Sequence, residues 1–130
     1  MAREIIIQTS MLVRNGAYQY QFTPSQMQID QSEVGGGSPG FLEVGADPEQ
    51  VLFSDIAVPG WAVFQNLDTL HYIDVGPDHD GGTGPVFVPA WRLMPGEYVI
   101  VRLIPGVDYW VQAPEATTEP VKLLAVVFNN

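Results

Sequence analysis

The sequence predicts an all-β fold, a single-domain β-sandwich of about ten short strands, with a jelly roll as the expected arrangement. Two observations lead to this prediction. Eleven prolines and thirteen glycines are scattered along the 130 residues, so they leave no clean window of helical length. Between them lie short segments rich in Val, Ile, Phe, Tyr and Trp, which is the pattern of strands separated by turns.

The first third of the chain supplies three short strands. Arg3–Thr9 contains three consecutive isoleucines and is expected to be the first strand. Ala17–Phe22 alternates aromatic residues with glutamines, which indicates one buried and one solvent-facing side. Met27 and Ile29 continue this alternation after a proline. Residues 1–9 are also considered as an extended N-terminal arm that adds a strand to a neighbour.

A glycine-rich stretch, Val34–Gly40 with the sequence VGGGSPG, follows these strands. About 35 residues before it are few for a separate domain, so we expect it to be a loop inside one domain that covers residues 1–130. Phe41–Val44 and Val51–Ile56 are the next expected strands, separated by the turn-like sequence ADPEQ.

Two later segments resemble each other. Pro59–Val75 and Pro95–Val111 each begin with Pro-Gly, continue with apolar alternation, turn, and return with aromatic residues. We expect the turns at Asp68-Thr69 and at Pro105-Gly106, which makes each segment a β-hairpin. Two copies with few identities do not amount to a repeat array.

The last expected strand, Val121–Phe128, is apolar on both faces except at Lys122. Such a strand is either central in a covered sheet or buried under a neighbour, because an exposed edge of this kind would invite aggregation. We therefore expect another part of the protein or a second chain to cover it. The residues expected to contact partners are Ile5, Ile6, Ile7, Trp91, Val127 and Phe128.

The charge balance disfavours two classes of partner. Five basic and fifteen acidic residues give a formal net charge of −10, with no cluster of Lys or Arg to offset it. Such a surface repels nucleic-acid phosphates and anionic membranes. The segment MAREIIIQTS has too short an apolar run for a signal peptide, and no run approaches the length of a membrane span.

The sequence carries no recognised catalytic motif, and we expect a protein that is not an enzyme and needs no cofactor. Cysteine is absent, which excludes disulfides, thiolate zinc ligands and cysteine nucleophiles. Neither a G-x-S-x-G elbow nor a phosphate-binding G-x-x-x-x-G-K loop occurs. A small hydrolase stays an alternative only because carboxylates are plentiful.

The segment IDVGPDHDGGTGPVF looks most like a binding site. Asp74, Asp78 and Asp80 are candidate cation ligands, since calcium prefers several oxygen ligands. The spacing does not fit an EF-hand, and aspartate and glycine suit turns for backbone reasons alone. We therefore expect residues 74–84 to be a connecting loop, with the cation site as the alternative. His71 is expected to be a half-buried structural residue in a strand.

Three tryptophans raise the alternative of a sugar-binding surface, because aromatic rings stack on carbohydrates. Large aromatic residues also dominate protein cores and interfaces. We expect Trp61 in the core, and Trp91, beside a turn, as the most exposed of the three.

The second half of the chain resembles a family of small all-β proteins found in the virions of tailed phages. The similar motifs are the N-L-D turn and Y-I-D-V-G return of PGWAVFQNLDTLHYIDVG, the L-M-P-G-E hairpin, and the apolar final strand VKLLAVVF. The resemblance covers Pro59–Phe128, which is 128 − 59 + 1 = 70 of the 130 residues. The N-terminal half carries no such match.

The resemblance implies a structural role in a virion, as a head decoration (cement) protein or as a tail component. We expect a decoration protein on the capsid exterior, assembled in the host cytoplasm, that binds the major capsid protein and its own copies as a trimer. The alternative is a ligand-binding β-sandwich, either a carbohydrate-binding module or a tail adhesin.

Overall fold

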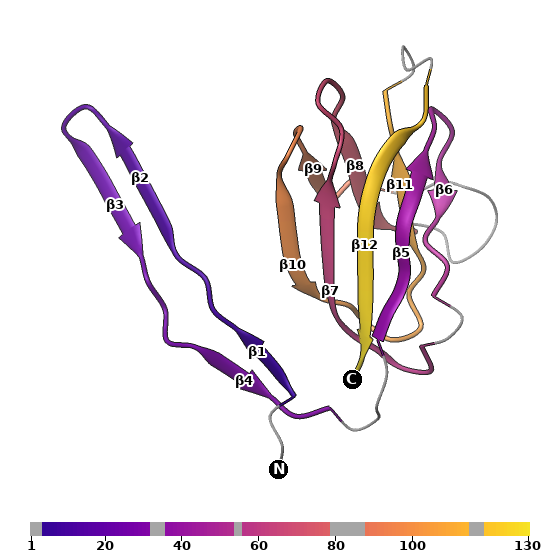
Figure 1. Ribbon diagram of the computed structural model, residues 1–130, viewed down its shortest axis with the longest axis horizontal. Coiled ribbons are helices and arrows are strands. Elements are labelled where there is room, and N and C mark those ends of the chain that lie inside the picture. Colours follow the sequence, from indigo (N-terminus) through magenta and orange to yellow (C-terminus); the bar gives the residue numbers. More distant parts are fainter. Residues whose placement is uncertain (1–3, 32–35, 54–55, 79–87, 115–118) are drawn as a thin grey trace. The chain divides into compact units, whose positions relative to one another are not determined.

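The computed structural model describes residues 4–31, 36–53, 56–78, 88–114 and 119–130, and in these ranges it contains twelve strands and no helix (Figure 1). The all-β prediction is confirmed. No helix in this part of the chain could cross a membrane. The chain divides into two compact units, Met1–Glu33 and Val34–Asn130, where we expected one domain.

The first unit is a two-stranded antiparallel ribbon, built from four strands: β1 (Ile5–Ile7), β2 (Met11–Asn15), β3 (Tyr18–Phe22) and β4 (Met27–Ile29). β1 pairs with β4, and β2 pairs with β3. We call the β1–β4 pair the proximal ladder, because β4 is the strand nearest in sequence to the second unit, and the β2–β3 pair the distal ladder. The backbone N–H of Gln31 donates a hydrogen bond to Glu4 Oε2 at 3.1 Å, which closes the ribbon beyond β4 and lowers the pKa of Glu4.

A tight turn joins the two strands of the distal ladder. Asn15 lies opposite Tyr18, so only Gly16 and Ala17 form the loop. Gly16 has a φ of 59°, which is the conformation that a type II′ hairpin requires at its first loop position. The sequence analysis missed strand β2, although the Asn15-Gly16 turn signal stands between the apolar run Met11–Val13 and the alternating segment Tyr18–Phe22.

The prediction that β3 buries its aromatic side is wrong for this structure. All residues of β2 and β3 are exposed. An alternating strand needs a second layer to bury its apolar side, and the distal ladder belongs to a two-stranded sheet. The alternation is real, but it creates an apolar surface.

The second unit is a β-sandwich of two four-stranded sheets, with strand orders β10-β7-β12-β5 and β6-β11-β8-β9 (Figure 1). All neighbouring strands are antiparallel. The first and last strands of the unit, β5 and β12, lie side by side, and the distribution of strands between the sheets is that of a jelly roll, as expected. The eight strands are β5 (Gly36–Val44), β6 (Glu49–Gln50), β7 (Pro59–Asn66), β8 (Ile73–Pro77), β9 (Trp91–Leu93), β10 (Tyr98–Arg102), β11 (Tyr109–Gln112) and β12 (Val121–Asn129).

The two expected hairpins are instead arches that cross between the sheets. β7 and β8 belong to different sheets, and so do β10 and β11. Each arm pairs with the matching arm of the other segment, β7 with β10 and β8 with β11. The likeness of Pro59–Val75 and Pro95–Val111 thus corresponds to equivalent places in the fold.

Two further expectations fail locally. Gly36–Gly40 belongs to strand β5, not to a loop, because its backbone pairs with the end of β12. Regular strand near Val51 is limited to β6, although the Val51 N–H still donates to the Tyr109 carbonyl at 2.8 Å. Residues 54 and 55 of the expected strand lie outside the described residues.

Strand β12 is central in its sheet, one of the two predicted placements, and it pairs with β7 along one side and with β5 along the other. Its residues alternate strictly: Val121, Leu123, Ala125 and Val127 are buried, while those between them are half-buried or exposed. The buried side faces a core contributed by both sheets, including Phe64, which is fully buried.

The side chain of Asn66 holds the conformation of the first arch, which is the connection from β7 to β8. It is fully buried at the end of β7, and its Nδ2 donates to the carbonyls of His71 at 2.7 Å and Leu93 at 2.9 Å. Its Oδ1 accepts the N–H of Asp68 at 2.8 Å. One carboxamide therefore satisfies three backbone groups, two within the arch and one on strand β9.

Asp68 and His71 complete this turn. The Asp68 carboxylate accepts the N–H groups of His71 at 2.7 Å and Leu70 at 3.0 Å, and these bonds lower the pKa of Asp68. His71 Nδ1 lies 3.0 Å from the same oxygen. His71 lies in the turn, half-buried, and not in a strand as expected.

We expect Asn66→Ala to destabilise the sandwich by about 3 kcal/mol, because it leaves buried backbone groups without partners. For a unit of this size, the melting temperature should fall by more than about 10 °C in a thermal melt followed by circular dichroism. Gln65→Ala, on the same strand but the opposite face, is the matched control and should change Tm little. Equal effects of the two substitutions would contradict this role of Asn66.

Candidate interaction surface

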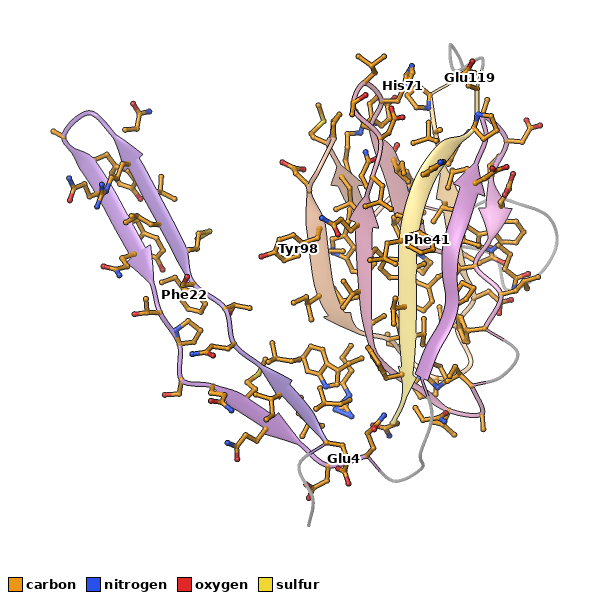
Figure 2. All side chains as sticks on the ribbon, viewed as in Figure 1. Glu4, Phe22, Phe41, His71, Tyr98 and Glu119 are labelled. Carbon is orange, nitrogen blue, oxygen red and sulfur yellow. The ribbon has the colours of Figure 1, made fainter. Side chains whose placement is uncertain are left out.

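The distal ladder carries an apolar face. Residues that pair across an antiparallel ladder point to the same side, so the pairs Met11–Phe22, Val13–Tyr20 and Asn15–Tyr18 share one face. Gln19, Gln21, Leu12 and Arg14 lie on the other. We call the apolar set the ribbon face, and Figure 2 marks Phe22 where β3 ends. Its members and their exposed fractions are Met11 50%, Val13 38%, Tyr18 63%, Tyr20 46% and Phe22 48%.

The backbone of the distal ladder is also available to a partner. Within the described chain, β2 pairs only with β3, so each strand has one edge without a neighbouring strand. Such edges accept a further strand from another chain. An isolated hairpin of this kind is marginally stable in water, which favours a partner that covers it.

A second apolar surface lies on the sandwich, on the outward side of the sheet β10-β7-β12-β5. The strand registers align its residues in rows across the sheet. We call this the outer sheet face. One row runs Tyr98, Gln65, Leu124, Phe41, and the next runs Ile100, Val63, Val126, Pro39; every member is half-buried or exposed.

The two edges of the outer sheet face carry its most exposed large side chains, Phe41 and Tyr98, which are labelled in Figure 2. Phe41 on edge strand β5 is 76% exposed and Tyr98 on edge strand β10 is 63% exposed, whereas Leu124 and Gln65 on the central strands are half-buried. At one end of the face a groove of about 450 Å³ is lined by Phe41, Leu42, Glu43, Leu67 and Lys122. Glu43 and Lys122 lie opposite each other in the ladder.

The residues expected to contact partners fall in different environments. Ile5 and Ile7 share one face of the proximal ladder with Met27, while Ile6 points to the other side and is 59% exposed. Phe128 is half-buried and belongs to the outward-facing positions of β12.

Val127 is placed differently from our expectation of a partner contact, whereas Trp91 keeps part of its surface exposed. Val127 is fully buried in the sandwich core, where no partner can reach it. Trp91 is half-buried and packs against the core from strand β9. Trp61, expected in the core, lies on β7 between buried neighbours and faces outward, with the guanidinium carbon of Arg102 5.9 Å from its ring centre.

Asp74 is not a loop residue. It lies in β8, opposite Arg92 on β9, and its carboxylate accepts two hydrogen bonds from that guanidinium, from Nε at 2.8 Å and Nη2 at 3.0 Å. The pairing raises the pKa of Arg92, whose guanidinium carbon also lies 3.9 Å from the ring centre of Tyr72. A cation at Asp74 would have to displace this bidentate ion pair.

The other candidate cation ligands are not assembled around Asp74 in the described structure. The backbone N–H of Asp78 donates to the carbonyl of Asp108 at 2.9 Å, next to the end of β8. Asp80 lies outside the described residues. In the ranges that the structure describes, no three Asp, Glu or His side chains are grouped so that they could hold a metal ion.

Charged residues are distributed unequally between the ribbon and the sandwich. Residues 5–29 of the ribbon contain a single charged side chain, Arg14. Residues 34–130 contain three basic and twelve acidic residues, which give a formal net charge of −9. The ribbon is therefore nearly neutral, whereas the sandwich is strongly acidic.

The sequence analysis did not predict that the ribbon face and the outer sheet face are exposed apolar surfaces. Strand alternation shows that a strand has two different sides, but not which side meets a core. For the ribbon, the Asn15-Gly16 turn between an apolar run and an alternating segment was a usable signal.

Comparisons with protein-family models, with curated proteins and with solved structures gave no match for this chain. The interpretation of these surfaces therefore depends on their own chemistry, which suits the burial of apolar area against another protein.

We expect thermal melts of the protein in calcium and in chelator to coincide, because Asp74 is already held by Arg92. A cation present at about 100 times its Kd would stabilise the fold by about 2.7 kcal/mol, which a melt readily detects. A large calcium-dependent shift that disappears in the double variant Asp78→Ala with Asp80→Ala would contradict this expectation.

Proposed function

We propose that this chain is a non-enzymatic structural protein of a tailed-phage virion, and specifically a capsid decoration protein. In this proposal it binds the major capsid protein on the outside of the head and also binds its own copies. It assembles in the host cytoplasm.

The observation that carries the proposal is the ribbon face. Five large apolar side chains are exposed by 38–63% on a two-stranded ladder with free edges. Solvent-exposed apolar groups of this size and number mark surfaces that bind other proteins. A protein whose work is attachment has a use for such a ribbon, whereas an enzyme would need a cleft with converging polar groups.

The sandwich supports the same role. Its two sheets enclose a continuous core, so it is a rigid body that tolerates exposure on a particle surface. Its charge of −9 favours a position away from packaged nucleic acid, because like charges repel. Jelly rolls are common among viral capsid components, an analogy of fold that adds to the resemblance in Pro59–Phe128.

The double substitution Tyr20→Ser with Phe22→Ser should abolish attachment to capsids and leave the sandwich folded. The measurement is co-sedimentation with capsids purified from the phage that encodes the chain and stripped of this protein. The matched control is Gln19→Ser with Gln21→Ser on the opposite face of the same strand, which should bind as the unmodified protein does. Failure of the unmodified protein to bind capsids would contradict the proposal.

A ligand-binding β-sandwich is the second candidate, and the groove beside Phe41 favours it. There a strongly exposed aromatic ring lies close to Glu43 and Lys122, which combines a stacking surface with a hydrogen-bond acceptor and donor. Aromatic stacking together with polar groups is how sugar sites bind and orient their ligands. Lectins also use the jelly roll.

If this second candidate is correct, migration in native gels should slow when a polysaccharide is cast into the gel, and Phe41→Ala should restore normal migration. Tyr98→Ala, on the opposite edge of the sheet, is the matched control and should leave the retardation unchanged. Normal migration of the unmodified protein across a panel of neutral and acidic polysaccharides would contradict a sugar-binding role.

A further inference from the structure

We infer that the ribbon of one copy docks on the outer sheet face of a second copy, with the ribbon face against the two central strands. The contact is heterologous, because a donor surface meets a different, acceptor surface. Repeated around a closed ring, each copy donates one ribbon and accepts one, so a neighbour covers each ribbon face and the assembled ring is the form that attaches to a capsid. The inference deepens the self-association part of the proposed function, but the contact itself does not require a capsid.

The dimensions of the two surfaces correspond. Strands in a sheet lie about 4.8 Å apart, so the edge strands β5 and β10 are separated by about 14 Å. Phe41 and Tyr98 stand on these edges, with smaller side chains between them. A two-stranded ladder is about 5 Å across its backbones and therefore fits over β7 and β12, between the edge strands that carry Phe41 and Tyr98.

The side-chain spacing also corresponds along the strands. The large pairs Met11–Phe22 and Val13–Tyr20 are two residues apart on the ribbon, a distance of about 6.8 Å. The rows of the outer sheet face that contain Leu124 and Val126 have the same separation. Pairs on one surface can thus pack between rows on the other, as in face-to-face sheets.

Charge favours a ribbon as the occupant of this face. Two sandwiches with a formal charge of −9 each repel, so direct contact between them is disfavoured. Residues 5–29 carry only Arg14, which lies on the polar side of the distal ladder. In the docked position this side points away from the sheet, and the apolar contact contains no charged side chain of the ribbon.

The chain mass in solution distinguishes a second copy from the same chain as the acceptor. Docking between copies multiplies the mass, whereas docking within one chain leaves it unchanged.

A complementation experiment tests the inference. The donor-deficient variant is Tyr20→Ser with Phe22→Ser, and the acceptor-deficient variant is Phe41→Ser with Leu124→Ser. Light scattering after size exclusion, without capsids, should give three chain masses for the unmodified protein and one for each variant alone. An equimolar mixture of the variants should give two chain masses, since it holds one intact donor and one intact acceptor.

Controls separate loss of docking from loss of folding. Gln19→Ser with Gln21→Ser should keep the unmodified mass. Thermal melts identify a misfolded variant, and Phe41→Ser alone replaces the acceptor-deficient variant if the double change unfolds the sandwich.

Two results would overturn the inference. Self-association that survives in the acceptor-deficient variant would show ribbon binding to ribbon, and a single chain mass for the unmodified protein at every concentration would show no intermolecular contact. A ring that forms without capsid binding would contradict only capsid decoration, whereas capsid binding by a protein that stays a single chain would contradict this inference and the self-association part of the proposed function but not capsid decoration.

Discussion

The path of the chain through the sandwich depends on the carboxamide of Asn66. At this point the chain leaves one sheet for the other, and three backbone groups lose the partners that a straight ladder would provide. The Asn66 side chain replaces all three partners from a fully buried position. Because one of the three is the carbonyl of Leu93, the same side chain ties the arch to strand β9. The backbone of Asn66 also accepts from Gly96 and donates to Glu97. The arch and the connection from β9 to β10 are therefore held in one arrangement.

With the arch fixed, each sheet has one side that meets the core and one that does not. The inward residues of β12 and β7 are Val, Leu, Ala and Phe, as a core requires. The outward residues of the same strands are also largely apolar, which a solvent-facing side does not require. Apolar residues in excess of what the core needs, together with a separate apolar ribbon, are the features on which the proposed contacts with other proteins rest. The concentration of acidic groups on the sandwich limits which contacts are favourable.

Sequence reasoning succeeded where the determining pattern is local. Prolines, glycines and alternation predicted the all-β class, and the two-sided apolar character of Val121–Phe128 predicted a strand that is central or covered. It failed where distant partners decide. A hairpin and an arch have the same local pattern, and only pairing of β7 with β10 distinguishes them. Asp74 looked like a loop ligand because its partner, Arg92, comes from another strand. The outer sheet face could not be predicted, since its rows join residues from four strands.

The pairing of β5 with β12 determines when, during folding, the outer sheet face is formed. The ribbon requires only local contacts, such as Asn15 with Tyr18, and hairpins of this kind form within about 1–10 μs. The outer sheet face requires Phe41 beside Leu124, a contact between strands at opposite ends of the sandwich sequence, and such non-local pairing is slow. During synthesis the strands of the ribbon can therefore pair transiently before β12 leaves the ribosome. The outer sheet face, which in our inference receives the ribbon, exists only after β12 has been added, so an unfinished chain has no acceptor surface.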